Sequence, residues 1–320
     1  MSAFDNAVIL TGPTACGKSA LALDLAERIG GEIVGLDSMT VYRGMDIGTA
    51  KPSAAERARV PHHLIDVLDP WESLTVAWWL ERAEAACADI TARGKVPIFV
   101  GGTPFYLKAL LHGLFDGPPG DPELRAALES EAAQVGNVAL HARLAVVDPK
   151  TAARLHPNDV RRVVRALEVH QLTGKPISDW QQTWDTPAFA VASQPAPPPV
   201  RVPAVRIDLP REVLYDRINS RVLQMIDAGF LDEVRRLREL PRPLSREAKQ
   251  ALGYRELLQY LDVGGDWNET VTLIQTHTRQ FAKRQLTWFR HLSACVPVSV
   301  DAPDAPDRVL RAWEAARMAS

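Results

Sequence analysis

The hydrophobic pattern of the first hundred residues alternates short apolar runs with helical periodicity. Residues 7–12 (AVILTG) are a short apolar run, and residues 19–30 (SALALDLAERIG) then repeat apolar side chains at helical spacing. Residues 32–37 (EIVGLD) form a second apolar run, a helical pattern extends from Thr75 to Arg93, and residues 96–102 (VPIFVGG) form a third run. Strands that alternate with helices predict an α/β fold with a parallel sheet flanked by helices.

A change of pattern near residue 118 predicts a second domain. Residues 113–125 (GLFDGPPGDPELR) are rich in glycine and proline, and Asp121-Pro122 is typical of a helix N-cap followed by a proline in the first turn. Every periodic segment from there to about Trp184 is helical, and SQPAPPPV (193–200) favours an extended connector. We therefore predict a core whose first part is residues 1–118 and an all-helical insertion at 119–195.

The strand pattern returns in VRVPAVRIDL (200–209). Helical patterns follow, notably at residues 211–228 and 267–291. Residues 196–320 are accordingly predicted to complete the core.

The first predicted strand and helix are joined by a phosphate-binding motif. Its eight residues fit G-x-x-x-x-G-K-[ST] between a strand and a helix: Gly12, Pro13, Thr14, Ala15, Cys16, Gly17, Lys18 and Ser19. Its glycines allow backbone N–H groups to point at phosphate oxygens, and the positive end of the following helix attracts the same charge. We expect Lys18 to neutralise phosphate and Ser19 to hold Mg²⁺. The pattern predicts a P-loop NTPase-like fold.

The motif alone leaves the phosphate compound open. A kinase or NTPase that uses ATP or GTP usually carries an acidic residue at the end of another apolar strand. The third run ends in Gly101-Gly102-Thr103 without an acid, whereas Asp37 at the end of the second run is suited to that role. A P-loop kinase of a nucleotide or small molecule therefore remains an alternative.

Composition adds broad limits. With 320 residues, of which 46% are hydrophobic and 24% charged, the chain is long enough to bury a sizeable core, and no apolar stretch is long enough to span a bilayer. Three widely spaced cysteines argue against a disulfide framework and favour the cytoplasm. The formal net charge of −2 neither requires nor excludes nucleic acid, because binding depends on where basic residues cluster.

Longer strings resemble one family. LDSMTVYRGMDIGTAKP (36–52), GPTACGKS (12–19) and GGTPFYLKALLHGL (101–114) closely resemble the tRNA dimethylallyltransferases, as do HPNDVRRVVRALEV (156–169), GYRE (253–256) and TRQFAKRQLTWFR (278–290). Cys16 stands where the family often has Ser or Ala, and Pro104-Phe105 replaces the common Met-Leu. Neither departure removes a group that the chemistry needs.

The resemblance implies a specific reaction. The P-loop would cradle dimethylallyl diphosphate, and the dimethylallyl group would pass to the N6 amine of adenosine 37 in tRNAs that read codons beginning with U. Mg²⁺ is the implied cofactor, and the tRNA anticodon stem-loop, gripped by the insertion, is the implied partner. We expect a monomer without an obligate protein partner.

Three residues are predicted to be catalytic, namely Asp37, Thr103 and Arg217. Adenine's exocyclic nitrogen is a poor nucleophile, so a carboxylate that takes its proton assists the reaction, and Asp37 is the candidate base. The alternative is an aspartate that caps a turn or binds Mg²⁺ through water. By resemblance, Arg217 reaches the diphosphate, although it also fits a solvated helix face, and Thr103 contacts the acceptor base region.

The remaining predicted residues bind tRNA. Arg161, Arg162 and Arg165 form a basic cluster, and residues 278–290 carry basic and aromatic side chains without an acid. We expect Phe281, Leu286 and Phe289 to be largely core. The complete set implied by resemblance is Asp37, Ser38, Met39, Thr40, Thr103, Arg125, Arg161, Arg162, Val163, Val164, Arg165, Gln250, Gly253, Tyr254, Arg255, Lys283, Arg284 and Gln285.

Three rivals predict different activities. A kinase would turn over ATP, and an adenylate isopentenyltransferase would prenylate free nucleotide. A noncatalytic RNA-binding protein with a vestigial P-loop would be indifferent to the loss of Asp37.

Overall fold

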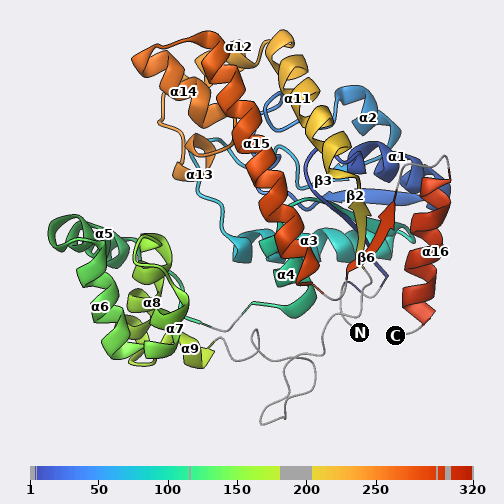
Figure 1. Ribbon diagram of the computed structural model, residues 1–320. Helices are drawn as coiled ribbons and strands as arrows, with labels where there is room; N and C mark the ends of the chain where they lie inside the picture. Colours follow the sequence, from blue (N-terminus) through green and yellow to red (C-terminus); the bar gives the residue numbers. More distant parts are fainter. Residues whose placement is uncertain are drawn as a thin grey trace. The chain divides into compact units, whose positions relative to one another are not determined.

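The computed structural model describes residue 4 and residues 6–114, 117–180, 204–292, 295–299 and 304–318. The chain forms two compact units, one made of residues 1–111 and 200–320 and the other of residues 112–199 (Figure 1). The predicted insertion at 119–195 lies inside the second unit, which begins earlier because it includes the segment that leads into its first helix. The predicted connector at 193–200 and the end of the helical segment near Trp184 lie outside the described residues.

The first unit contains a parallel sheet in the order β3-β2-β4-β1-β5-β6. The central strand β1 pairs with β4, Leu10 opposite Val100, and with β5, Leu10 opposite Val205. The strands are β1 (Val8–Thr11), β2 (Gly31–Gly35), β3 (His62–His63), β4 (Val96–Gly101), β5 (Ala204–Asp208) and β6 (Cys295–Ser299). The predicted α/β class with a parallel sheet is confirmed.

Helices cover both faces of this sheet (Figure 1). The helices of the first unit are α1 (Lys18–Ile29), α2 (Ala54–Arg59), α3 (Val76–Ala92), α4 (Pro104–His112), α11 (Arg211–Asp227), α12 (Phe230–Arg238), α13 (Arg246–Lys249), α14 (Tyr254–Val263), α15 (Trp267–Arg290) and α16 (Ala305–Met318). The three long helical segments predicted from periodicity therefore match α3, α11 and α15 to within a residue at each end.

Alternation along the strands divides the core into two layers. Ile9 and Phe99 face a cluster that includes Trp79 of α3, whose indole N–H donates to the Gly35 carbonyl at 3.0 Å. Val8 and Ile98 face the opposite cluster, which α1, α11 and α16 complete. Because strand side chains alternate between faces, buried apolar residues on both faces require helices on both sides.

A buried carboxylate fastens β2 to the elements beside it. Glu32 is 4% exposed and accepts hydrogen bonds from His63 at 2.7 Å and from the guanidinium of Arg93, which follows α3. The Arg93 hydrogen bond, with a smaller contribution from His63, lowers the pKa of Glu32 to about 2 although burial opposes the shift. This cluster joins β2, β3 and α3.

All regular elements in the described part of the second unit are helices. It contains α5 (Pro122–Val135), α6 (Asn137–Val147), α7 (Pro149–Arg154), α8 (Val160–Thr173) and α9 (Ile177–Trp180). Asp121 caps α5 by accepting hydrogen bonds from the backbone amides of Glu123 and Leu124, and Pro122 occupies the first turn as predicted. Leu128, Leu144 and Leu167 belong to its own apolar core. None of the helices in the described ranges is long and apolar enough to cross a membrane.

Candidate active site

The carboxyl ends of β1, β2 and β4 meet at the predicted site. Gly101 at the end of β4 lies so close to the chain after β2 that a Cβ atom there would come within 1.9 Å of the Leu36 carbonyl oxygen. Beyond this crossing, Thr103 Oγ1 accepts a hydrogen bond from the Ser38 amide at 3.2 Å. Residues 37–40 and 101–103 are thereby brought together at the sheet edge where parallel α/β proteins bind ligands.

Asp37 shapes the loop that it begins. Its Oδ1 accepts hydrogen bonds from the amides of Met39 at 2.8 Å and Thr40 at 3.3 Å, the turn-capping arrangement anticipated as an alternative to catalysis. Oδ2 accepts no hydrogen bond from the described residues. One oxygen therefore holds the turn, and the other is free to act on a ligand.

The P-loop leads directly into α1. Gly17 precedes the helix with φ 94°, in the left-handed region that favours glycine, and no side chain caps the first turn. The first amides of α1 therefore remain as donors for an anion. Lys18 Nζ donates to the Pro13 carbonyl at 2.7 Å and forms no ion pair with any described residue.

Gln285 of α15 links this loop to β4. It is 3% exposed; its Oε1 accepts from the Thr14 amide at 2.9 Å, and its Nε2 donates to the Gly102 carbonyl at 2.5 Å. Both functional groups of its side chain are used inside the protein, and the role of Gln285 in tRNA binding stays a prediction. The Thr14 amide is likewise occupied by Gln285.

Two adjoining cavities open at this sheet edge. The first, the P-loop cavity, has a volume of about 140 Å³ and is lined by Lys18, Ser19 and the apolar side chains of Ile33 and Val100. The second, the outer cavity, has a volume of about 510 Å³. Residues shared by the two linings are Thr14, Ala15, Asp37, Thr49, Arg221 and Phe281. Asp37 thus lies at the junction of the two spaces.

Arg221 of α11 is a functional candidate that the sequence did not single out. Its half-buried guanidinium lines both cavities and has no hydrogen bond or ion pair with a described residue. Burial lowers the pKa of Arg221, and the nearby Cys16 and Asp37 only partly offset this effect. Since removing an unpaired charge from water is costly, the site is suited to an anion. Its spacing of four residues from Arg217 was the available signal.

Arg217 and Ser19 also lie at the P-loop. Arg217 is exposed, and its Nη1 is 3.8 Å from the position that a Cβ atom would take on Gly17. Ser19 is exposed and lines the P-loop cavity. Three predicted phosphate ligands, Lys18, Ser19 and Arg217, are therefore on one side of Asp37.

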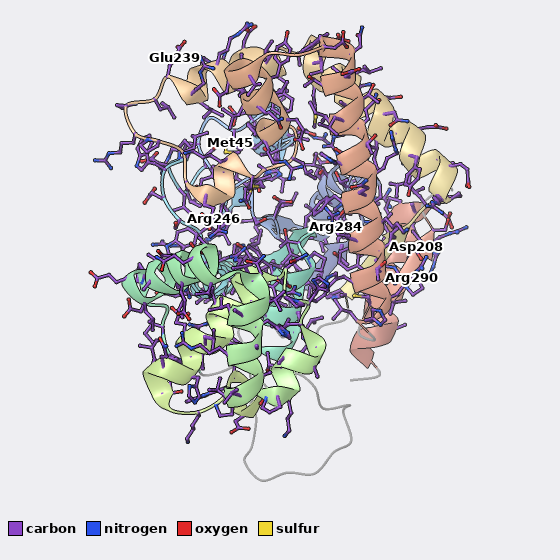
Figure 2. The ribbon with its side chains drawn as sticks, turned by 60° about the vertical axis from the view of Figure 1, so that its left-hand side comes forward. Met45, Asp208, Glu239, Arg246, Arg284 and Arg290 are labelled. Carbon is purple, nitrogen blue, oxygen red and sulfur yellow. The ribbon has the colours of Figure 1, made fainter. Side chains whose placement is uncertain are left out.

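Several predicted tRNA contacts gather on the outer cavity instead. Its lining includes Ser38, Met39, Thr103, Gln250, Tyr254, Arg255 and Arg284. Figure 2 labels Arg284 in the middle part of α15 and Arg290 at its end. Phe289 is buried, as expected, whereas Phe281 lines both cavities and Leu286 is half-buried. Thr40 lines the P-loop cavity, and Lys283 is exposed without lining either cavity.

Tyr254 and Gly253 have structural partners. Tyr254 is 1% exposed, packs edge-on against Phe230 and donates to Glu233 at 2.6 Å, and the Gly253 amide donates to Glu256 at 2.8 Å. Glu233 in turn accepts from the backbone amides of residues 46–48. The hydroxyl of Tyr254, predicted to bind tRNA, is therefore engaged in holding this loop.

In the helical unit, the residues predicted to bind tRNA differ in burial and in their partners. Glu168 is fully buried and binds Arg125 at 2.8 Å and Arg165 at 2.6 Å, which fixes both guanidinium groups. Arg161 and Arg162 are exposed. Val163 and Val164 are 0% and 2% exposed, so their side chains pack in the unit's core, and their role in tRNA binding stays a prediction. The helical spacing of Val163, Val164 and Leu167 was the signal for this core.

These features define a phosphate-binding α/β enzyme in which a P-loop space and a larger space meet at one carboxylate. The sequence profile of the IPP transferase family matches residues 40–292. The chain therefore belongs to the IPP transferase family.

Relatives with known names are similar to this chain over most of its length. The tRNA dimethylallyltransferase of Geobacter metallireducens is 52% identical over 289 residues, covering 90% of this chain and 91% of the relative. That of Roseiflexus sp. is 45% identical and covers 96% of this chain and 98% of the relative.

Solved structures of transferases also resemble this fold. The tRNA isopentenylpyrophosphate transferase of Bacillus halodurans has a TM-score of 0.70 at 37% identity, covering 98% of this chain and 97% of that one. A eukaryotic dimethylallyltransferase described as acting on tRNA has a TM-score of 0.75 at 28% identity, covering 96% of this chain and 77% of that one. The predicted P-loop-like fold with a helical domain is confirmed.

Proposed function

We propose that this protein transfers the dimethylallyl group of dimethylallyl diphosphate to the N6 amine of adenosine 37 in tRNAs that read codons beginning with U. The diphosphate is released, and the new bond joins N6 to the allylic carbon. The names of the relatives support tRNA and a dimethylallyl donor. The position of the adenosine and the choice of tRNAs rest on the family resemblance of the motifs.

The observation that carries the proposal is the position of Asp37 between two cavities. The P-loop cavity combines Lys18 and Ser19 with apolar walls, which suits a short isoprenoid attached to a diphosphate. The outer cavity is larger and is lined by Arg255 and Arg284, which suits a nucleotide of an RNA. Donor and acceptor that enter these two spaces meet beside Asp37.

At this junction, Asp37 takes the N6 proton as the carbon–nitrogen bond forms. Its carboxylate is already oriented because Oδ1 is held by the Met39 and Thr40 amides. A base fixed in this way lowers the barrier without reorganising during the reaction. An adenosine of the anticodon loop must leave its stack to reach the junction.

Negative charge that develops on the departing diphosphate is stabilised from the opposite side. The first-turn amides of α1, Lys18, Arg217 and Arg221 surround the P-loop with donors and positive charge. The hydroxyl of Ser19 is a hard oxygen ligand on the cavity wall and fits Mg²⁺, which when bound supplies further charge neutralisation. Thr103 sits on the acceptor side, where it holds the Ser38 amide.

The test is incubation of the purified protein with labelled dimethylallyl diphosphate, Mg²⁺ and unmodified tRNA, followed by nucleoside analysis. We expect N6-dimethylallyladenosine at position 37 only in tRNAs that read codons beginning with U. A tRNA with guanosine at that position is the matched control. Transfer to AMP alone, or ATP turnover with a phosphorylated product, would overturn the proposal in favour of the nucleotide prenyltransferase or the kinase.

We also propose that the enzyme acts as a monomer in the cytoplasm. Cys16, Cys87 and Cys295 are buried and form no disulfide with a described residue, which is compatible with a reducing compartment. Light scattering at assay concentration tests the monomer.

A further inference from the structure

His277 of α15 lies on the wall of the outer cavity and belongs to a hydrogen-bonded group that the sequence motifs do not explain. Its side chain is 28% exposed, and its Nδ1 lies 2.7 Å from Glu256 Oε1. Glu256 is 1% exposed, and its other oxygen accepts the Gly253 amide at 2.8 Å. A buried carboxylate with bonds on both oxygens is a rigid support for the imidazole.

This contact fixes the tautomer of His277. The Glu256 carboxylate is an acceptor, and the hydrogen bonds from His277 and Arg255 lower its pKa against the effect of burial. Nδ1 therefore carries the proton that Glu256 accepts. Arg255 Nη2 lies 3.0 Å from Nδ1 and donates to the same Glu256 oxygen, so both groups approach one carboxylate oxygen as donors. With the proton on Nδ1, the neutral form of the ring presents Nε2 as a hydrogen-bond acceptor.

Nε2 has no hydrogen-bond partner among the residues that the structure describes. Nδ1 is directed to Glu256, so the opposite edge of the ring is the part available to a ligand in the outer cavity. The same wall carries the cationic side chains of Arg255 and Arg284, which attract an RNA backbone. An acceptor placed among cations distinguishes groups that carry a hydrogen from phosphate oxygens, which do not.

We propose that His277 Nε2 accepts a hydrogen bond from the RNA, donated by a base exocyclic amine or by a ribose 2′-hydroxyl, and that Glu256 is the positioning residue that sets the tautomer. The proposal rests on the proposed function, because it takes tRNA as the occupant of the outer cavity. It gives the cavity a recognition group beside its non-specific charges.

The first experiment measures binding without catalysis. Fluorescence anisotropy with an unmodified anticodon stem-loop RNA is compared for the wild type and His277→Ala, with exposed His291→Ala as the control. Loss of one neutral hydrogen bond predicts a Kd that is about 3- to 10-fold higher in His277→Ala and unchanged in the control. An unchanged Kd in His277→Ala would overturn the proposal, whereas a wild type that binds no RNA would contradict the proposed function itself.

Two substitutions separate the ring nitrogens. The amide of His277→Gln reaches the position of Nε2, whereas the shorter amide of His277→Asn reaches only that of Nδ1. We expect His277→Gln to recover part of the affinity and His277→Asn to recover none. Equal Kd values for His277→Gln and His277→Asn would assign the effect to packing. A Kd difference between wild type and His277→Ala that is seen at pH 6 and disappears at pH 8 would assign it to the imidazolium. Either result would refute an Nε2 acceptor.

RNA variants identify the donor. Single 2′-deoxy substitutions in the loop remove one hydroxyl each, and purine replacements without the exocyclic amine remove one base donor each. At the recognised position, the wild type and His277→Ala should bind the altered RNA equally well. If the difference persists for every altered position, no RNA donor faces His277 and the proposal fails. KM for dimethylallyl diphosphate should be unchanged in His277→Ala, because the donor enters the other cavity.

Discussion

Gln285 Oε1 accepts a hydrogen bond from the Thr14 amide at 2.9 Å, across 271 residues of sequence. The same side chain donates to the Gly102 carbonyl. The position of the P-loop therefore depends on a helix near the other end of the chain as well as on its own glycines. The phosphate-binding loop and helix α15 are therefore connected through one side chain.

Substitution of Gln285 by Ala is expected to weaken this connection. It leaves the buried Gly102 carbonyl and the Thr14 amide without their partner, which costs about 1–3 kcal/mol of unfolding free energy. We also expect a higher KM for the diphosphate donor, because the P-loop loses a support. Urea unfolding and steady-state kinetics measure the two effects. The control is Gln259→Ala on the exposed side of α14, and equal stability of the two variants would contradict the assigned role.

Asp37→Asn separates the two functions of Asp37. The amide oxygen of asparagine still accepts the Met39 and Thr40 amides, so the turn and the stability should be retained. Asparagine cannot take a proton, so we expect kcat to fall by about 10²- to 10⁴-fold. Exposed Asp227→Asn at the end of α11 is the control. Wild-type kcat in a folded Asp37→Asn enzyme would leave Asp37 as a turn residue only.

Arg221→Met is expected to improve stability while it impairs binding. Methionine removes the cost of a half-buried guanidinium that lacks a partner, so the unfolding free energy should be equal to that of the wild type or higher. Loss of a charged hydrogen bond to the diphosphate should raise its Kd by about 10- to 100-fold. Calorimetry and urea unfolding provide the readouts. Arg236→Met, on the surface of α12, should change neither, and a strongly destabilised Arg221→Met would mean that Arg221 is structural.

The lowered pKa of Glu32 predicts that the stability of the fold decreases in acid. Its pKa is lowered to about 2 in the folded protein from an ordinary value of 4.5, so the unfolded chain binds its proton more tightly. This stability is fully present above pH 4.5 and is lost as the pH falls toward 2. Because Arg93 is 44% exposed, we expect about 1–2 kcal/mol after screening.

The measurement is urea unfolding of Glu32→Gln and wild type at pH 7 and pH 3. The difference in unfolding free energy between them should shrink at the lower pH, whereas exposed Glu84→Gln should match the wild type at both. A difference that is constant with pH would show that the ionisation of Glu32 does not contribute.

Val163→Ala tests whether the buried side chain of Val163 takes part in tRNA binding. The substitution leaves a cavity in the core of that unit and should cost about 1–3 kcal/mol. The tRNA affinity of the folded variant should be unchanged, while Arg161→Ala, which alters an exposed cation, should weaken it. Unfolding monitored in the helical unit measures the stability, and fluorescence anisotropy with tRNA measures the affinity. A loss of affinity in Val163→Ala without loss of stability would show that the valine side chain contributes to tRNA binding directly.

Local patterns predicted most of the fold. The strand, loop and helix around Lys18 are adjacent in sequence, so periodicity and the motif were sufficient, and Asp121-Pro122 identified the start of α5 for the same reason. Helical spacing on α8 carried the information that Val163 is buried, but the resemblance treated the whole string as a contact surface. A motif identifies a functional segment, whereas the packing of that segment determines which of its side chains are exposed.

The parts that sequence did not predict depend on long-range contacts. Nothing near Gln285 indicates that it reaches Thr14 and Gly102, because those partners lie in the loops after β1 and β4. Arg217 and Arg221 lie one turn apart on α11, and only the packed sheet determines that Arg221 lines both cavities. The same holds for His277, whose partner Glu256 belongs to another helix.

The strand order also has a consequence for the growing polypeptide. β1 lies between β4, which precedes the helical unit in the chain, and β5, which follows it. On the ribosome, the phosphate-binding strand therefore has one open edge until residues 204–208 have emerged, whereas residues 112–199 are contiguous and can complete their own unit beforehand. An open strand edge is a site for pairing with other chains, so the interval in which the insertion is translated is the period when the nascent core most needs protection.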